Sequence, residues 1–162
     1  MICPIVTVDS PHAAVLHMHA YAVTCFSQTL CNIVDDMWDS MYAAQGVGLA
    51  APQIGVDLAV AVIDISFKED AKAKIVLINP EISYASDYMV TESEGCLSMP
   101  GLRWPIKRPQ LTRVDAQKLD GSPFTIEGKG LLARALLHEI DHLNGKLCNR
   151  LAPRGEDCRG AQ

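Results

Sequence analysis

Two histidines and a glutamate in the last third of the chain have the spacing of a metal site with an adjacent base. His138 and His142 stand four residues apart, and Glu139 lies between them in a stretch rich in helix-forming residues. Side chains four residues apart lie on one face of a helix, with their Cβ atoms about 5 to 6 Å apart. Both imidazoles can therefore bind one cation. The pattern predicts hydrolysis in which a metal activates water and Glu139 transfers the proton.

A catalytic metal that keeps one position open for water usually has three protein ligands, so a third one is required. The carboxylates that follow the motif, Glu156 and Asp157, lie in a segment that we expect to be disordered. Upstream, Cys96 offers a thiolate, which is a strong ligand for Fe(II), Zn(II), Co(II) or Ni(II). The neighbouring Gly95 would allow a close approach of the backbone. We therefore expect Cys96 to complete the site.

A third segment carries groups suited to a developing negative charge. The residues Gly46-Val47-Gly48-Leu49-Ala50-Ala51-Pro52-Gln53 include small side chains beside which a substrate backbone can lie. Gln53 has a neutral amide that can donate to an oxyanion without competing for the metal. Taken alone, such a segment is more often a helix cap and a turn. It lacks the ending of a phosphate-binding loop, so no nucleotide is predicted.

The hydrophobic periodicity predicts an α+β domain that would hold these segments. Apolar residues at intervals of three and four indicate helices over 25–42 and 129–143, the second capped by Asn144-Gly145. Residues 1–22 are expected to be irregular. Runs of β-branched or alternating residues predict strands over 58–65, 75–83, 88–92, 111–119 and 123–127. A turn at Asp120-Gly121 joins the last two of these strands. We predict one catalytic domain over 1–151 and a disordered tail over 152–162.

Composition narrows the class of protein. The chain has 162 residues, of which 49% are hydrophobic and 20% charged, which is typical of a globular domain. A net charge of −5 with scattered basic residues argues against nucleic-acid binding. The absence of a long apolar run or a secretory signal predicts an intracellular protein that does not span a membrane. The six cysteines lack Cys-x-x-Cys spacing and are expected to be reduced, and His12, His17 and His19 are interpreted as solvated or partly buried.

Together, three segments resemble the motifs of the peptide deformylase family. That family is marked by Gly-x-Gly-x-Ala-Ala-x-Gln, Glu-Gly-Cys-Leu-Ser and His-Glu-x-Asp-His. Here these motifs are residues 46–53, 94–98 and 138–142, within a resemblance over roughly 30–150. The resemblance implies an α+β fold with mixed or antiparallel sheets around a central metal-binding helix. It also implies removal of the formyl group from the N-terminal formylmethionine of nascent polypeptides, with release of formate.

The resemblance further implies roles for individual residues. Cys96, His138 and His142 would bind Fe(II), with Zn(II), Ni(II) or Co(II) as substitutes, and Glu139 would be the acid and base. Gln53 and the backbone N–H of Leu97 would stabilise the oxyanion. Val47, Leu131 and Ala135 would line a pocket for methionine, Gly48 would hydrogen-bond the substrate backbone, and Arg103 would contact the peptide beyond methionine. Glu94 would pair with Arg108 behind the site. The full set of implied substrate-binding residues is Gly46, Val47, Gly48, Glu94, Arg103, Leu131 and Ala135.

Some alternatives stay open from the sequence. Asp141 would either accept a hydrogen bond from a ligand imidazole or bond to nearby backbone. The His-Glu-x-x-His motif alone is also compatible with a zinc endopeptidase, and a metal-bearing peptide-binding protein without turnover is a third reading. The resemblance favours formylated peptides as substrates, a weak association with the ribosome and a cytoplasmic, bacterial-type enzyme of cellular, phage or organellar origin.

Overall fold

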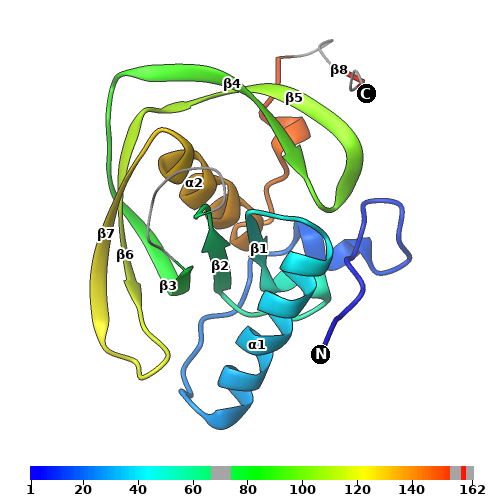
Figure 1. Ribbon diagram of the computed structural model, residues 1–162, viewed down its shortest axis with the longest axis vertical. Coiled ribbons are helices and arrows are strands. Elements are labelled where there is room, and N and C mark those ends of the chain that lie inside the picture. Colours follow the sequence, from blue (N-terminus) through cyan, green and yellow to red (C-terminus); the bar gives the residue numbers. More distant parts are fainter. Residues whose placement is uncertain (67–73, 154–157, 160–162) are drawn as a thin grey trace.

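The computed structural model describes residues 1–66, 74–153 and 158–159, and two antiparallel sheets and two helices form its framework (Figure 1). The larger sheet has five strands in the order β1 (Gly48–Ala50), β2 (Val60–Asp64), β3 (Lys74–Ala85), β6 (Leu111–Gln117) and β7 (Pro123–Lys129). The smaller sheet has the order β4 (Met89–Cys96), β5 (Met99–Pro109) and β8 (Cys158–Arg159). The helices are α1 (Gln28–Ala43) and α2 (Leu131–Leu143), with short 3-10 turns η1 (Ala13–His17), η2 (Ala51–Ile54) and η3 (Cys148–Arg150).

The two helices cover opposite faces of the larger sheet because successive side chains of a strand point to opposite sides. On β2, Ala61 and Ile63 belong to the buried cluster that contains the apolar stripe of α2. Val60 and Val62 belong to the cluster that contains the apolar stripe of α1. Every residue of β2 is buried, which explains why its sequence is a continuous apolar run ending in Asp64.

The smaller sheet covers the side of α2 that faces away from the larger one. In Figure 1 the long strands β4 and β5 pass over α2, so this helix lies between the two sheets. A third buried cluster joins β5 to η1 and to the segment after α2, and it consists of Leu16, Cys96, Met99, Trp104, Ile106, Leu147 and Cys148. One face of α2 is therefore apolar against the larger sheet, and the face that carries the histidines meets β4.

The α+β prediction with a central helix is confirmed, and both helices form close to their predicted places. The second one begins at Leu131 because Lys129 is the last residue of β7 and Gly130 turns the chain with a φ of 55°. Strand β5 was missed by the sequence analysis, since Pro100, Gly101 and Pro105 are typical of turns. The segment 46–53 is more than a helix cap and a turn, because it contains the edge strand β1 as well as the turn η2.

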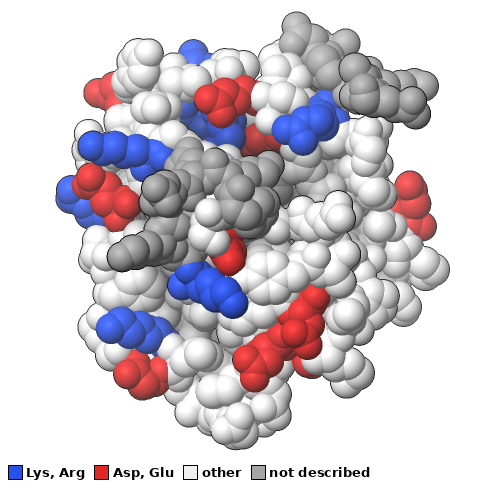
Figure 2. All heavy atoms as spheres, in the orientation of Figure 1, with Lys and Arg blue, Asp and Glu red and all other residues white. Residues whose placement is uncertain are grey.

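Other sequence expectations concern the ends and the surface. Residues 1–22 lack strands and helices apart from η1, and His12, His17 and His19 are exposed. Of the expected tail, 154–157 and 160–162 lie outside the described residues, whereas β8 pairs with Leu102 and Arg103 of β5. Acidic and basic side chains are interspersed on the face shown in Figure 2. Among the helices in the described ranges, none has the length and apolar character needed to cross a membrane.

Candidate active site

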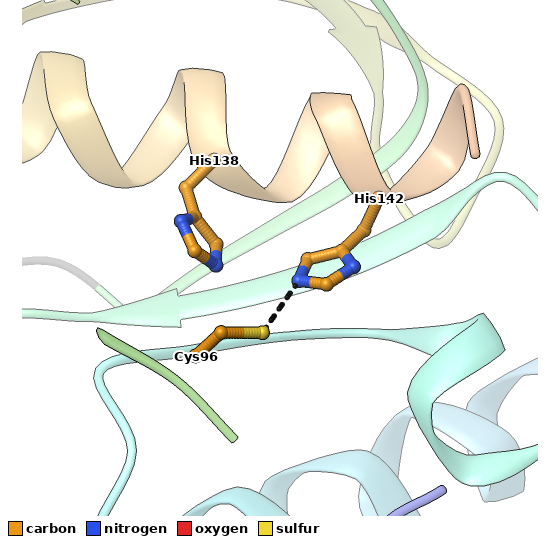
Figure 3. Close-up of side chains that lie close together, drawn as sticks. All are labelled: Cys96, His138 and His142. Carbon is orange, nitrogen blue, oxygen red and sulfur yellow. Dashed lines mark hydrogen bonds between the residues drawn. The ribbon is translucent and has the colours of Figure 1, made fainter. Parts of the chain in front are cut away.

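The three predicted metal ligands come together from two elements that are far apart in the sequence. Cys96 ends β4, and His138 and His142 project from one face of α2 towards it (Figure 3). Their ligand atoms all lie within 4.8 Å of one another, and the Cys96 Sγ is 3.2 Å from the His142 Nε2. Metal bonds of about 2.0 to 2.3 Å place the donors on one ion roughly 3 to 4 Å apart. The cluster therefore fits one divalent cation, and no other such cluster occurs in the described part of the chain.

The protonation of the two histidines suits ligation through Nε2. The His138 Nδ1 lies 2.9 Å from the Glu94 Oε2, and because a carboxylate accepts, Nδ1 carries the proton and leaves Nε2 free for a metal. Burial lowers the pKa of His138, but the hydrogen bond to Glu94 and the negative charges of Glu139 and Glu94 together raise it, which makes Nε2 a stronger electron-pair donor to a metal. Burial lowers the pKa of His142 well below its usual value, so His142 is neutral at pH 7, as a ligand must be.

Glu94 is the centre of a buried polar network behind the ligands. It accepts from Arg108 Nε at 2.6 Å and Nη2 at 3.0 Å, which confirms the predicted ion pair, and from Arg134 Nη1 at 2.7 Å. Burial alone would raise the pKa of Glu94, but hydrogen bonds from His138 and Arg108 lower it to about 2. Glu94 is therefore ionised at all ordinary pH values and holds the His138 ring in place.

We expect the pKa of Glu94 to produce acid-dependent stability. Its pKa falls from 4.5 to about 2 on folding, which corresponds to about 3 kcal/mol at neutral pH. Because the folded-state pKa is the lower one, this contribution is complete above pH 4.5 and is lost as the pH falls to about 2. Urea denaturation of the metal-free protein between pH 2 and 7 measures it.

The matched variant for this stability prediction is Glu94→Gln, which cannot ionise. We expect it to be less stable than the unmodified chain at pH 7 and to show a smaller loss of unfolding free energy between pH 4.5 and 2. Equal slopes for the two proteins would show that Glu94 does not carry the effect.

Glu139 is buried beside the ligands, and its surroundings suit proton transfer. Only 4% of the residue is exposed, and its Oε2 has no hydrogen-bond partner among the residues that the structure describes. Burial raises its pKa to about 7, against a smaller lowering by the nearby His138. A carboxyl group with a pKa near 7 can both accept and release a proton at neutral pH.

Gly48 on β1 lies so close to Glu139 that a side chain would displace the carboxylate. A Cβ added at Gly48 would lie 2.3 Å from the Glu139 Oε1 and 2.9 Å from Cδ. We expect Gly48→Ala to fold, because the end of a side chain can move, and to lose about 10²-fold in turnover, because proton transfer depends on that position. Steady-state formate release measures this loss. In a Glu139→Ala background, Gly48→Ala should lower the turnover only slightly further. A further loss of about 10²-fold, as in the unmodified chain, would contradict the explanation.

The orientation of Gln53 directs its amide nitrogen towards the metal ligands. The Gln53 Oε1 accepts from the backbone N–H of Ala50 at 2.9 Å, which fixes which end of the amide is oxygen. The Nε2 therefore faces the other way, where it donates to Ser98 Oγ at 3.1 Å and lies 3.8 Å from the Cys96 Sγ. A donor in this position can reach an oxyanion formed next to the metal.

A cleft of about 730 Å³ opens onto these groups. It brings together all the predicted site residues except His142, which is buried behind it. The lining thus includes Gln53, Cys96, Leu97, His138 and Glu139, together with the predicted substrate-contact residues Gly46, Val47, Gly48, Glu94, Arg103, Leu131 and Ala135. Arg103 lies in an exposed part of this lining and donates to the Oγ of Ser93 at 3.0 Å and its carbonyl at 2.8 Å.

The structure corrects the sequence analysis at three positions. Both readings of Asp141 are wrong, since its Oδ2 accepts from Arg108 Nη1 at 2.7 Å while Glu94 bonds to the imidazole. Cys148, which the sequence did not single out, is buried in the same cluster as Cys96, and this neighbour together with burial raises the pKa of Cys96. Arg134 was missed, although its place one turn before His138 on the same helix face was a usable signal.

Comparison with known proteins agrees with this geometry. The family profile described as polypeptide deformylase matches residues 2–156. A peptide deformylase of Acidobacterium capsulatum is 51% identical over 147 residues, covering 91% of this chain and 84% of that one. Peptide deformylase 1 of Pseudomonas syringae pv. tomato is 50% identical over 116 residues, covering 72% and 68%.

Solved structures show the same likeness in three dimensions. The crystal structure of a peptide deformylase from Legionella pneumophila has a TM-score of 0.87 and 42% identity, covering 95% of this chain and 88% of that one. A peptide deformylase from Synechococcus elongatus, in complex with actinonin, has a TM-score of 0.86 and 34% identity, covering 93% and 80%.

Proposed function

The chain belongs to the peptide deformylase family and is a metal-dependent amide hydrolase that removes N-formyl groups from nascent peptides. We propose that Cys96, His138, His142, Glu139, Gln53 and Leu97 perform this reaction. The observation that carries the assignment of residues is the meeting of Cys96, His138 and His142 beside Glu139 at the end of one cleft. Cys96, His138 and His142 would hold the cation, which when bound supplies a Lewis acid that activates water.

Glu139 moves the proton in this proposal. Its buried carboxylate accepts a proton from the attacking water and then gives it to the leaving amine. The Gln53 Nε2 and the backbone N–H of Leu97 donate to the oxygen of the formyl group as it becomes negative. The buried position of Glu139 excludes bulk water, which strengthens these electrostatic effects.

The peptide backbone would align along β1, the edge strand of the larger sheet. The carbonyl of Val47 accepts from the N–H of Asp64 on β2. Because hydrogen bonds alternate along an antiparallel pair, the backbone groups of Gly48 point to the open edge, where an extended peptide can add as a strand. Val47, Leu131 and Ala135 would then contact an unbranched apolar side chain such as methionine.

The direct test is formate release from formyl-Met-Ala-Ser by protein loaded with iron, nickel or zinc. We expect release with this peptide and no cleavage of peptides that are blocked at both ends. Cleavage of internal bonds would indicate a zinc endopeptidase, and tight binding without formate would indicate a peptide-binding protein. Either result would overturn the proposal.

We propose Fe(II) as the native metal, with Zn(II), Ni(II) or Co(II) as substitutes. An Fe(II) ion bound by the thiolate of Cys96 is open to oxidation, whereas Ni(II) is not readily oxidised. We expect the iron form to lose activity in air within an assay series and the nickel form to stay steady. Parallel assays under air and under argon measure the difference. Equal decay of both forms in air would contradict a redox cause.

The chemistry of the substrate supports two further proposals about where the enzyme acts. Formylated N-termini are present on chains that are being synthesised, so we propose a cytoplasmic, bacterial-type enzyme with weak ribosome association. Sedimentation with and without ribosomes at low and high salt tests the association, and no salt-sensitive co-sedimentation would refute it.

A further inference from the structure

We propose that Arg134 is a positioning residue of the metal site: it clamps Glu94, and it holds helix α2 at the distance from β4 that lets Cys96 and the two histidines share one cation. The inference rests on the proposed ligand set. Arg134 is not expected to touch the metal or the formyl group, so its effect would act through Glu94 and through the placement of the helix.

The contacts of Arg134 join α2 to both long strands of the smaller sheet. Its Nη1 donates to the Glu94 Oε1 at 2.7 Å and to the carbonyl of Ile106 at 2.8 Å, and its Nη2 donates to the carbonyl of Val90 at 2.9 Å. Its Nε lies 3.4 Å from a carboxylate oxygen of Glu92. Only 6% of the residue is exposed. A buried guanidinium with this many partners holds a single position.

Arg134 and His138 approach the same carboxylate from successive turns of α2. Arg134 bonds to the Oε1 of Glu94, and His138 bonds to the Oε2. If Glu94 rotated to satisfy one of them better, it would weaken its bond to the other. The orientation of the His138 ring, and thus the direction of its Nε2, therefore depends on Arg134.

The second arginine of the network makes fewer contacts between the helix and the sheet. Arg108 lies on β5, next to β4, and its ion pair with Glu94 is a contact within the smaller sheet, while its Nη1 donates to the Oδ2 of Asp141 on α2 at 2.7 Å. Arg134 lies on the helix, so its contacts with Val90, Ile106 and Glu94 cross from the helix to the sheet. Cys96 stands at the end of β4 and the histidines stand on α2, so a shift between these two elements would separate the ligands.

The test is the binding of Co(II), which needs no substrate. Thiolate charge-transfer and d–d absorption bands of Co(II) report bonding to Cys96 and the geometry of the site. We expect Arg134→Met, which keeps the apolar stem but removes every donor, to weaken Co(II) binding about 10- to 100-fold, as outer-shell changes at metal sites typically do. We also expect altered d–d bands. Arg134→Lys keeps a positive charge and N–H donors, so its loss should be smaller. A loss should remain, because an ammonium cannot serve three acceptors in the planar geometry of a guanidinium.

Arg113→Met is the matched control, because Arg113 is a half-exposed arginine that pairs with Glu127 on the larger sheet. It should bind Co(II) like the unmodified chain. A lower melting temperature for Arg134→Met with unchanged Co(II) affinity and spectrum would show a merely structural role and would overturn the proposal. If Arg134→Met does not fold, Arg134→Lys decides in the same way.

Failure of this inference is distinguishable from failure of the proposed function. An unmodified chain that binds Co(II) through Cys96 but releases no formate would contradict the function and leave the role of Arg134 to be read from the spectra. An active unmodified chain with Arg134 variants that bind Co(II) normally would contradict only the inference.

Discussion

Replacing Glu139 with alanine is expected to lower the turnover of formyl-Met-Ala-Ser by about 10²- to 10⁴-fold, the usual contribution of a general acid and base, while the protein retains its metal. Glu139 is not one of the three clustered ligands, and its carboxylate lies in the cleft beside them. Removing it takes away the group that moves the proton and leaves the cation donors untouched. Steady-state kinetics and metal analysis of the purified variant measure both quantities.

A control variant and a conservative substitution accompany Glu139→Ala. Glu127→Ala removes a half-exposed carboxylate on the larger sheet and should have the kinetics of the unmodified chain. Glu139→Gln keeps the shape of the side chain but cannot accept the proton, so it should be nearly as slow as Glu139→Ala. Full activity in either Glu139 variant would remove it from the mechanism, and loss of the metal would mean that Glu139 is a ligand.

Removal of one metal ligand is expected to empty the site. With Cys96→Ala or His142→Ala, only two of the three donors remain, and the loss of affinity should exceed the roughly 10- to 100-fold effect of an outer-shell change. Activity should disappear with the metal, because no Lewis acid would then activate water. Metal content after gel filtration, measured by atomic absorption, checks this prediction.

The controls for the ligand variants are chosen by residue type. Cys25→Ala and His17→Ala change exposed residues and should retain both metal and activity. Cys148→Ala is the more demanding comparison, because Cys148 contacts Cys96 but is not part of the three-residue ligand group. It should keep one metal per chain. Full metal occupancy in Cys96→Ala or His142→Ala, in a folded protein shown by circular dichroism, would refute the ligand assignment.

Local sequence signals were sufficient where the physics is local. The spacing of His138 and His142 placed both on one helix face because the helical repeat sets that relation without help from the rest of the fold. The apolar stripe of α1 and the β-branched run of β2 similarly reflect burial that the elements themselves require. The three motifs indicated which residues to look for in the cleft, including Gln53 and Glu94.

Long-range pairing was less visible in the sequence. Strand β5 contains Pro100, Gly101 and Pro105, and it is a strand because eight successive residues of β4, from Met89 to Cys96, have partners on it. The edge strand β1 is short and rich in small residues, and its pairing with β2 defines it. Local propensity is weak in both places, so tertiary pairing determined the outcome.

The amino-acid sequence by itself determined the reactive groups of this protein: a thiol, two imidazoles one helical turn apart, a carboxyl group between them and an amide in a segment of small residues. Only the tertiary structure decided how these groups are held and tuned. The partner of His138 is Glu94 and not Asp141, Arg134 joins the helix to the smaller sheet, and burial raises the pKa of Glu139. The physical reason is that hydrogen-bond partners and desolvation depend on which distant segments pack together, and no local spacing records that.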